Sequence, residues 1–125
     1  MARLHREVAD AISGSLGSRG NPALVMCHVS HVYETGCSLY FTFLALQREG
    51  GEIDQWREVK RAACDAIVDG GGTITHHHAV GRDHAEWMER EISAGGVGAL
   101  RALKAELDPR GIMNPGKLLP VIPSA

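Results

Sequence analysis

The 125-residue sequence has few aromatic residues, only three cysteines, little net charge and no long hydrophobic segment. Its apolar runs fall far short of the roughly 18 residues that a membrane-spanning helix needs, which excludes such a helix. A formal net charge of −2 provides no basic field to attract nucleic acid or an anionic membrane. The cysteines, Cys27, Cys37 and Cys64, form no CxxC pair. We therefore expect a cytoplasmic protein whose reduced thiols act as small core residues.

The composition is otherwise that of an ordinary globular protein, with 44% hydrophobic and 22% charged residues. A chain of this length is expected to form one domain over residues 1–125 and to bury about two-thirds of its unfolded surface.

The spacing of apolar residues predicts the order of the secondary structure. The expected elements are a helix over 3–17, strands over 23–33 and 37–46, a helix that includes 53–67, a short strand over 72–75 and helices over 85–93 and 97–107. Breaks are expected at 17–22 (GSRGNP), at the glycines of 70–72 and at Gly95-Gly96, and the prolines at 115, 120 and 123 predict an irregular tail. This order predicts an α+β fold, in which helices pack on one face of an antiparallel sheet.

Alternation along the two strands predicts which side chains share a face. Val25, Cys27, Val29 and His31 are expected on one face of the first strand. Gly36 closes the expected hairpin turn, where it is free to take a positive φ.

The most unusual segment is GGGTITHHHAVG, residues 70–81, which contains three consecutive histidines. Histidine is a good general acid or base because it ordinarily titrates near neutrality, and a protonated member of a cluster can bind an anion. His76 and His78 could instead share a strand face and bind a metal, although no Cys-His spacing supplies the remaining ligands. The third interpretation is a polar loop without chemistry.

Two further segments are candidates for a site. Tyr40 is expected on the strand face opposite Leu39, Phe41 and Phe43, so its hydroxyl can point away from the helices; the alternative is a half-buried sheet tyrosine. The segment DPRGIMNPGKLL, residues 108–119, would by itself be a helix end followed by an irregular tail.

Taken together, three segments resemble the C-terminal part of FAD-linked oxidases of the vanillyl-alcohol oxidase type. The segments are HVYETGCSLYFTF, GGTITHHHAVGRDHAEWMERE and ALRALKAELDPRGIMNPGKLLP, in that order. Within this family the resemblance is greatest to the alkyldihydroxyacetonephosphate synthases, because the triple histidine is typical of that branch. DPRGIMNPGK is shared more widely and indicates only the superfamily.

The resemblance implies a role for each candidate. Tyr40 falls on a catalytic acid/base tyrosine, and His76, His77 and His78 fall on histidines that position the substrate and its phosphate beside the flavin. The segment Asn114-Pro115-Gly116-Lys117 resembles the one that returns to the FAD domain, so Asn114, Gly116 and Lys117 are expected to contact the cofactor, FAD. The implied reaction replaces the acyl group of an acyl-dihydroxyacetone phosphate by an alkyl group, without net redox change.

The resemblance also bears on metal binding. In the dehydrogenase branch of the family, histidines and a carboxylate hold a metal ion. His31 and His78 match two of those positions, but Tyr40 and His77 replace a histidine and the glutamate. We therefore expect no metal.

The family's FAD-binding domain, with its glycine-rich pyrophosphate loops, has no counterpart in these 125 residues. The chain is thus expected to be inactive by itself. It is expected to act together with an FAD-binding domain or subunit on a small phosphate or acid substrate, and to be able to form a homo-oligomer. The alternatives are a stand-alone anion- or metal-binding α+β module and a fragment of an FAD-linked 2-hydroxyacid dehydrogenase.

Overall fold

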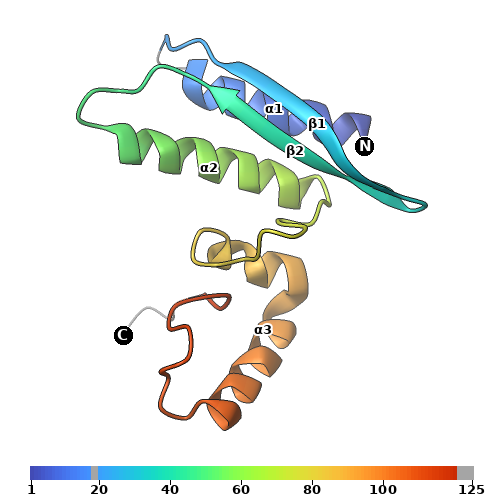
Figure 1. Cartoon of the computed structure of the whole chain (residues 1–125), viewed down its shortest axis with the longest axis vertical. Coiled ribbons are helices and arrows are strands. Elements are labelled where there is room, and N and C mark those ends of the chain that lie inside the picture. The colour runs from blue at the N-terminus through green and yellow to red at the C-terminus, as the bar shows by residue number, and fades with distance from the viewer. Residues whose placement is uncertain (18–19, 121–125) are drawn as a thin grey trace. The chain divides into compact units, whose positions relative to one another are not determined.

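The computed structural model describes residues 1–17 and 20–120 (Figure 1). The chain divides into two compact units, Met1–Gly72 and Thr73–Ala125. The middle of the expected break at 17–22, Ser18 and Arg19, and the expected tail proline Pro123 lie outside the described residues.

The first unit consists of two helices and a hairpin, α1 (Ala2–Gly17), β1 (Leu24–Tyr33), β2 (Gly36–Leu44) and α2 (Glu52–Asp69). Its core forms between the helices, where Val8, Ile12 and Leu16 of α1 meet Val59 of α2. The spacing of four residues places the three α1 side chains on one stripe of the helix. Each is at most 3% exposed, so this stripe holds the unit together.

One face of the antiparallel hairpin packs on this core. Val25 and Phe41, one from each strand, contact the core cluster together with Ala23 and Ala45. The opposite face is open, and Leu24 and its partner Leu44 are about 60% exposed there, at 58% and 61%. The expected α+β class, with helical packing on one face of an antiparallel sheet, is confirmed.

Two details of this unit differ from expectation. The hairpin turns through Glu34 and Thr35, and neither they nor Gly36 take a positive φ, so the freedom of the glycine is not used. On α2, Ile53 and Trp56 are 63% and 46% exposed, because the helix meets the core only from Val59 onward.

The second unit contains a loop, a short 3-10 helix η1 (Ala85–Trp87), the helix α3 (Met88–Leu107) and the tail. The expected strand over 72–75 does not form. Instead, Ile74 is buried and its backbone N–H donates to the Glu91 carboxylate of α3 at 2.9 Å. A side chain takes up the hydrogen bond that a neighbouring strand would have accepted.

The break expected at Gly95-Gly96 lies at Ser93 instead. Ser93 has φ 69° and ψ 164°, and the helix continues on both sides of it. Its hydroxyl accepts a hydrogen bond from the Gly96 N–H at 3.4 Å, as an N-cap residue does. The two expected helices therefore form one kinked element.

The second unit also contains buried apolar side chains, which are those of Ile74, Ala85, Trp87, Met88 and Val97. Within residues 1–17 and 20–120, no helix is both long and apolar enough to cross a membrane.

Candidate functional site

A β-bulge in β1 decides which side chains lie on the open face of the hairpin. Val29 pairs with Leu39 and His31 pairs with Ser38, so Ser30 is an extra residue between them. Paired residues share a face, and neighbours along a strand alternate. His31 therefore lies on the face opposite Leu39.

The expectation that His31 shares the face of Val29 is thus wrong, because one inserted residue reverses the alternation. The bulge instead brings His28 and His31, three positions apart, to the same open face as Tyr40. Strict alternation could not have predicted that these three residues share a face.

Tyr40 is held on the open face by its neighbours. Phe41, next in the chain, packs on the core, which turns Tyr40 outward. The cross-strand partner His28 lies with its ring centroid 5.2 Å from that of Tyr40, at an interplanar angle of 34°. Tyr40 is 40% exposed, so a ligand can reach it. Its phenol can donate or accept a hydrogen bond, which is the property a proton-transfer group needs.

His31 is oriented by two local contacts on the same strand. Its Nδ1 lies 3.1 Å from the Ser30 hydroxyl oxygen, and its ring stacks on Tyr33 at a centroid distance of 6.4 Å. The bulge residue thus also orients the histidine that it displaces.

In the second unit, His76, His77 and His78 form a bent, exposed loop rather than a strand. The Nδ1 atoms of His76 and His77 are 3.0 Å apart. The rings of His77 and His78 meet edge to face, with centroids 4.3 Å apart. Because the loop is not a strand, the expected alternation that would put His76 and His78 on one face does not apply. Three adjacent imidazoles on an accessible loop suit proton transfer or anion binding.

The histidine loop is fixed at both ends. On one side Ile74 is buried, and on the other Ala79 and Gly81 take positive φ values of 64° and 59°, which turns the chain. The Gly81 carbonyl then accepts a hydrogen bond from the Leu118 N–H at 2.8 Å. The exposed imidazoles therefore stand between two anchored points.

The start of the tail that leads to Asn114, Gly116 and Lys117 is held by one carboxylate. Asp108, at the end of α3, accepts hydrogen bonds from the backbone N–H groups of Ile112 and Met113 at 3.1 and 2.9 Å. The Lys104 ammonium donates to the same carboxylate and to the Met113 carbonyl. The Lys104 hydrogen bond, followed by the bond from Met113, holds the pKa of Asp108 below its usual value.

Beyond this anchor the tail forms tight turns. Asn114 and Gly116 have positive φ values of 46° and 69°, and the Lys117 N–H donates to the Asn114 carbonyl at 3.3 Å. All three expected cofactor-contacting residues are exposed.

The structure brings the tail against the segment that follows the histidines. A side-chain carbon placed on Gly116 would lie 3.8 Å from Nε of Arg82. Arg82 was missed in the sequence, where the signal was only a basic residue directly after Gly81. Tyr40 belongs to the first unit, and the triple histidine, Arg82 and the tail belong to the second.

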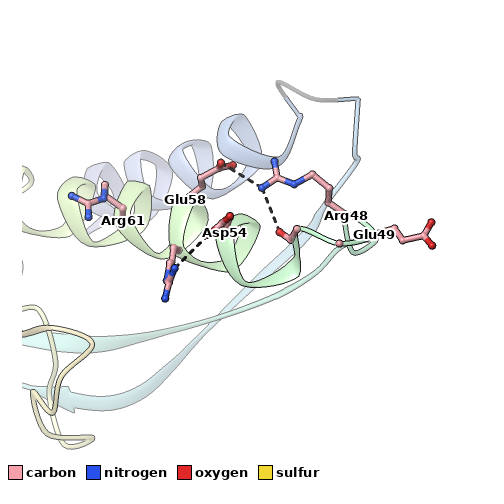
Figure 2. A pocket seen from close by; sticks show the side chains of 8 residues that line it. Arg48, Glu49, Asp54, Glu58 and Arg61 are labelled. Atoms are coloured by element: carbon pink, nitrogen blue, oxygen red, sulfur yellow. Dashed lines mark hydrogen bonds and ion pairs between the residues drawn. The ribbon is translucent and has the colours of Figure 1, made fainter.

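A cavity of about 560 Å³ lies at the start of α2, and none of the candidate site residues named above lines it (Figure 2). Arg48 donates to Glu58 at 3.5 Å and to the Gly51 carbonyl at 3.4 Å, while Arg57 pairs with Asp54 at 3.4 Å. Most of the charged side chains that line the cavity thus pair with one another, which is typical of ion pairs that stabilise the start of a helix.

Residues 1–118 match the family described as FAD linked oxidases, C-terminal domain. The chain belongs to this family. It is 39% identical over 119 residues to an alkyldihydroxyacetonephosphate synthase of Trypanosoma brucei brucei, a match that covers 95% of the chain and 19% of that protein. A synthase of the same name from Dictyostelium discoideum is 41% identical over 104 residues, covering 83% of the chain and 17% of the relative. A glycolate oxidase subunit of Bacillus subtilis (strain 168) is 40% identical over 71 residues, covering 57% of the chain and 15% of the relative.

The chain therefore spans about one-fifth of the length of the synthases it matches. The resemblance inferred from the sequence is confirmed, and so is the expected link of the full-length family members to FAD. Family membership favours this interpretation over a stand-alone module that binds an anion or a metal.

Proposed function

We propose that this FAD-linked oxidase C-terminal domain forms the substrate side of an enzyme that exchanges an acyl for an alkyl group, as the name alkyldihydroxyacetonephosphate synthase implies. The observation that supports this most strongly is the 39% identity to such a synthase over 95% of the chain. The exposed Tyr40 and the exposed triple histidine add support, because both kinds of side chain can move protons.

In this proposal Tyr40 acts as the acid/base group. In the exchange, the bond between the substrate carbon and the carboxylate oxygen breaks, and a bond from the same carbon to the oxygen of a fatty alcohol forms. The alcohol loses its proton as this bond forms, and the Tyr40 hydroxyl accepts that proton while it donates its own to the departing carboxylate, which leaves as the carboxylic acid. Phe41 and His28 keep the Tyr40 ring in place, because one anchors the strand to the core and the other packs against the ring.

The three histidines help to position the substrate and its phosphate. Their loop is anchored by the buried Ile74 and by the hydrogen bond between Gly81 and Leu118. A loop fixed in this way keeps His76, His77 and His78 in place without a conformational search, which lowers the entropic cost of binding.

The tail residues are suited to lie against FAD. Asn114 and Lys117 are exposed, and Gly116 presents backbone without a side chain, so a flat ring or a phosphate can approach it closely. FAD, when bound, supplies the isoalloxazine ring beside which the exchange takes place. Asn114 contributes an amide, and Lys117 contributes a positive charge that favours an anionic group.

The partner in this proposal is an FAD-binding domain or subunit, and the complete enzyme is cytoplasmic. The open hairpin face carries the exposed apolar side chains Leu24 and Leu44, which supports self-association of the isolated chain.

A second candidate function is the oxidation of a 2-hydroxy acid. The match to a glycolate oxidase subunit, at 40% identity over 71 residues, favours it. A fusion that replaces the C-terminal part of the Trypanosoma relative with this chain separates the two. If the fusion binds FAD and transfers a labelled fatty alcohol to acyl-dihydroxyacetone phosphate, the proposal holds. If it reduces a dye with glycolate and transfers no label, the second function replaces it.

A further inference from the structure

We propose that Arg82 and Lys117 form a binding site for a phosphate ester on the two turns that meet at Gly81 and Leu118. This inference deepens the proposed function and rests on it only for the identity of the molecule that carries the phosphate. The geometry of the site belongs to the second unit alone and can be tested on this chain.

The two cations stand on short, hydrogen-bonded turns. The Leu118 N–H donates to the Gly81 carbonyl at 2.8 Å, which joins the residues that neighbour Lys117 and Arg82 in the chain. The Ala85 N–H donates to the Arg82 carbonyl at 3.3 Å, and the Leu119 N–H donates to the Lys117 carbonyl at 2.8 Å. The backbone on each side of the joint is therefore fixed before a ligand arrives.

The Arg82 guanidinium presents one edge to the bare backbone of Gly116. A side-chain carbon on Gly116 would lie 3.8 Å from Nε and 4.0 Å from Nη2 of Arg82. These two nitrogens make up the side-on fork of the guanidinium, which donates two parallel hydrogen bonds to a phosphate or carboxylate. Because Gly116 has no side chain, no β-carbon is in van der Waals contact with these two nitrogens, as one would be in any other residue at this position.

Charge points to an anion with more than one negative charge. Among residues 1–17 and 20–120, neither Arg82 nor Lys117 forms an ion pair or a side-chain hydrogen bond. Lys104 and Arg101 of the same unit, in contrast, are bonded to Asp108 and to the Pro120 carbonyl. Two cations without acid partners at one joint suit the dianion of a phosphate monoester, with the fork of Arg82 giving direction and Lys117 adding charge.

The test measures binding of sn-glycerol 3-phosphate, inorganic phosphate and ADP to the isolated chain by calorimetry, with acetate as the carboxylate control. Arg82→Gln and Lys117→Gln should each weaken phosphate-ester binding by about tenfold or more, because each removes a charge-assisted hydrogen bond. Arg82→Lys should also weaken it, since it keeps the charge and removes the fork. The matched control is Arg110→Gln, which removes the same charge from an exposed residue three positions beyond the C-terminal end of α3.

Each outcome either supports or overturns the proposed phosphate-ester site. Preference for glycerol 3-phosphate assigns the site to a substrate phosphate, and preference for ADP assigns it to the nucleotide. Both results support the proposal. Equal loss in Arg110→Gln, undiminished binding in Arg82→Gln, or equal affinity for acetate would overturn it. Circular dichroism confirms that each variant is folded. The assay needs no flavin, so an inactive fusion enzyme leaves this result intact, and absence of phosphate binding leaves the exchange reaction open.

Discussion

Replacing His76, His77 and His78 together by alanine tests whether these histidines serve a ligand or the fold. All three are exposed, so the replacement creates no cavity, and substitutions of this kind usually change the free energy of unfolding by less than about 1 kcal/mol. The matched control is Ile74→Ala in the same segment. Ile74 is 6% exposed, and removal of a buried isoleucine side chain costs about 2–5 kcal/mol.

The assay is urea unfolding followed by fluorescence of Trp87, which is 5% exposed in the second unit. Trp56→Phe removes the other tryptophan, an exposed residue of the first unit. With a slope near 2 kcal/mol/M, Ile74→Ala should lower the midpoint by roughly 1 to 2.5 M, and the triple replacement by less than about 0.5 M.

A triple replacement that destabilises the protein as much as Ile74→Ala would refute this reasoning. The histidines would then hold the loop in place, and their proposed role toward the substrate would lose its support. A small shift, in contrast, would leave them available for binding.

Four further results follow from the structure. The isolated chain should purify colourless and should not retain FAD through gel filtration; a yellow protein with stoichiometric FAD would contradict this. Light scattering should detect a dimer or larger species because Leu24 and Leu44 are exposed on the open hairpin face, and a clean monomer at high concentration would count against it. Asp108→Asn should lower the melting temperature at neutral pH. Because the folded-state pKa of Asp108 is depressed, its contribution to stability is present above the unfolded pKa near 4 and is lost as the pH falls through the folded value. The melting temperatures of wild type and variant should therefore converge in acid, and a difference that stays constant with pH would contradict this. Alkylation should spare Cys64, which is 2% exposed, and should be slow at Cys27, whose pKa is raised by burial and then by Cys37; rapid labelling of Cys64 in the folded chain would be inconsistent with this core.

The helical part of the first unit could be predicted because its signal is local. Val8, Ile12 and Leu16 repeat every four residues, and the structure buries all three on one stripe. The hairpin was equally clear, since Phe41 and Val25 alternate with residues of the open face. Of the three cysteines expected to act as core residues, only Cys64 is buried, whereas Cys27 and Cys37 are half-buried on the hairpin.

The errors arose where a single residue or a distant side chain decides the structure. The bulge at Ser30 reverses the alternation of β1, and the hydrophobic pattern of the sequence does not predict a single extra residue. The segment around Ile74 has the composition of a strand, but the Glu91 carboxylate, seventeen positions away, takes its backbone hydrogen bond. The break in α3 lies at Ser93 rather than at the glycines, because its hydroxyl caps the following turn.

The candidate site could be predicted only as separate pieces. Tyr40, the histidines and the tail residues were identified from the resemblance, and the structure adds what holds each of them. The joint between Gly81 and Leu118, which gives Arg82 its place beside Gly116, connects residues that are far apart in the chain and could not be read from spacing.

The most direct test of the central claim compares Tyr40→Phe with Tyr33→Phe in the fusion that restores the FAD-binding domain. Both tyrosines are exposed residues of the same hairpin, so each variant removes one hydroxyl from a similar position. FAD content, read from the visible spectrum, verifies that both variants are folded. If Tyr40 transfers a proton in the exchange, Tyr40→Phe should lower the rate of alkyl transfer by about 100-fold or more, while Tyr33→Phe should leave it nearly unchanged. Full activity of Tyr40→Phe would contradict the account.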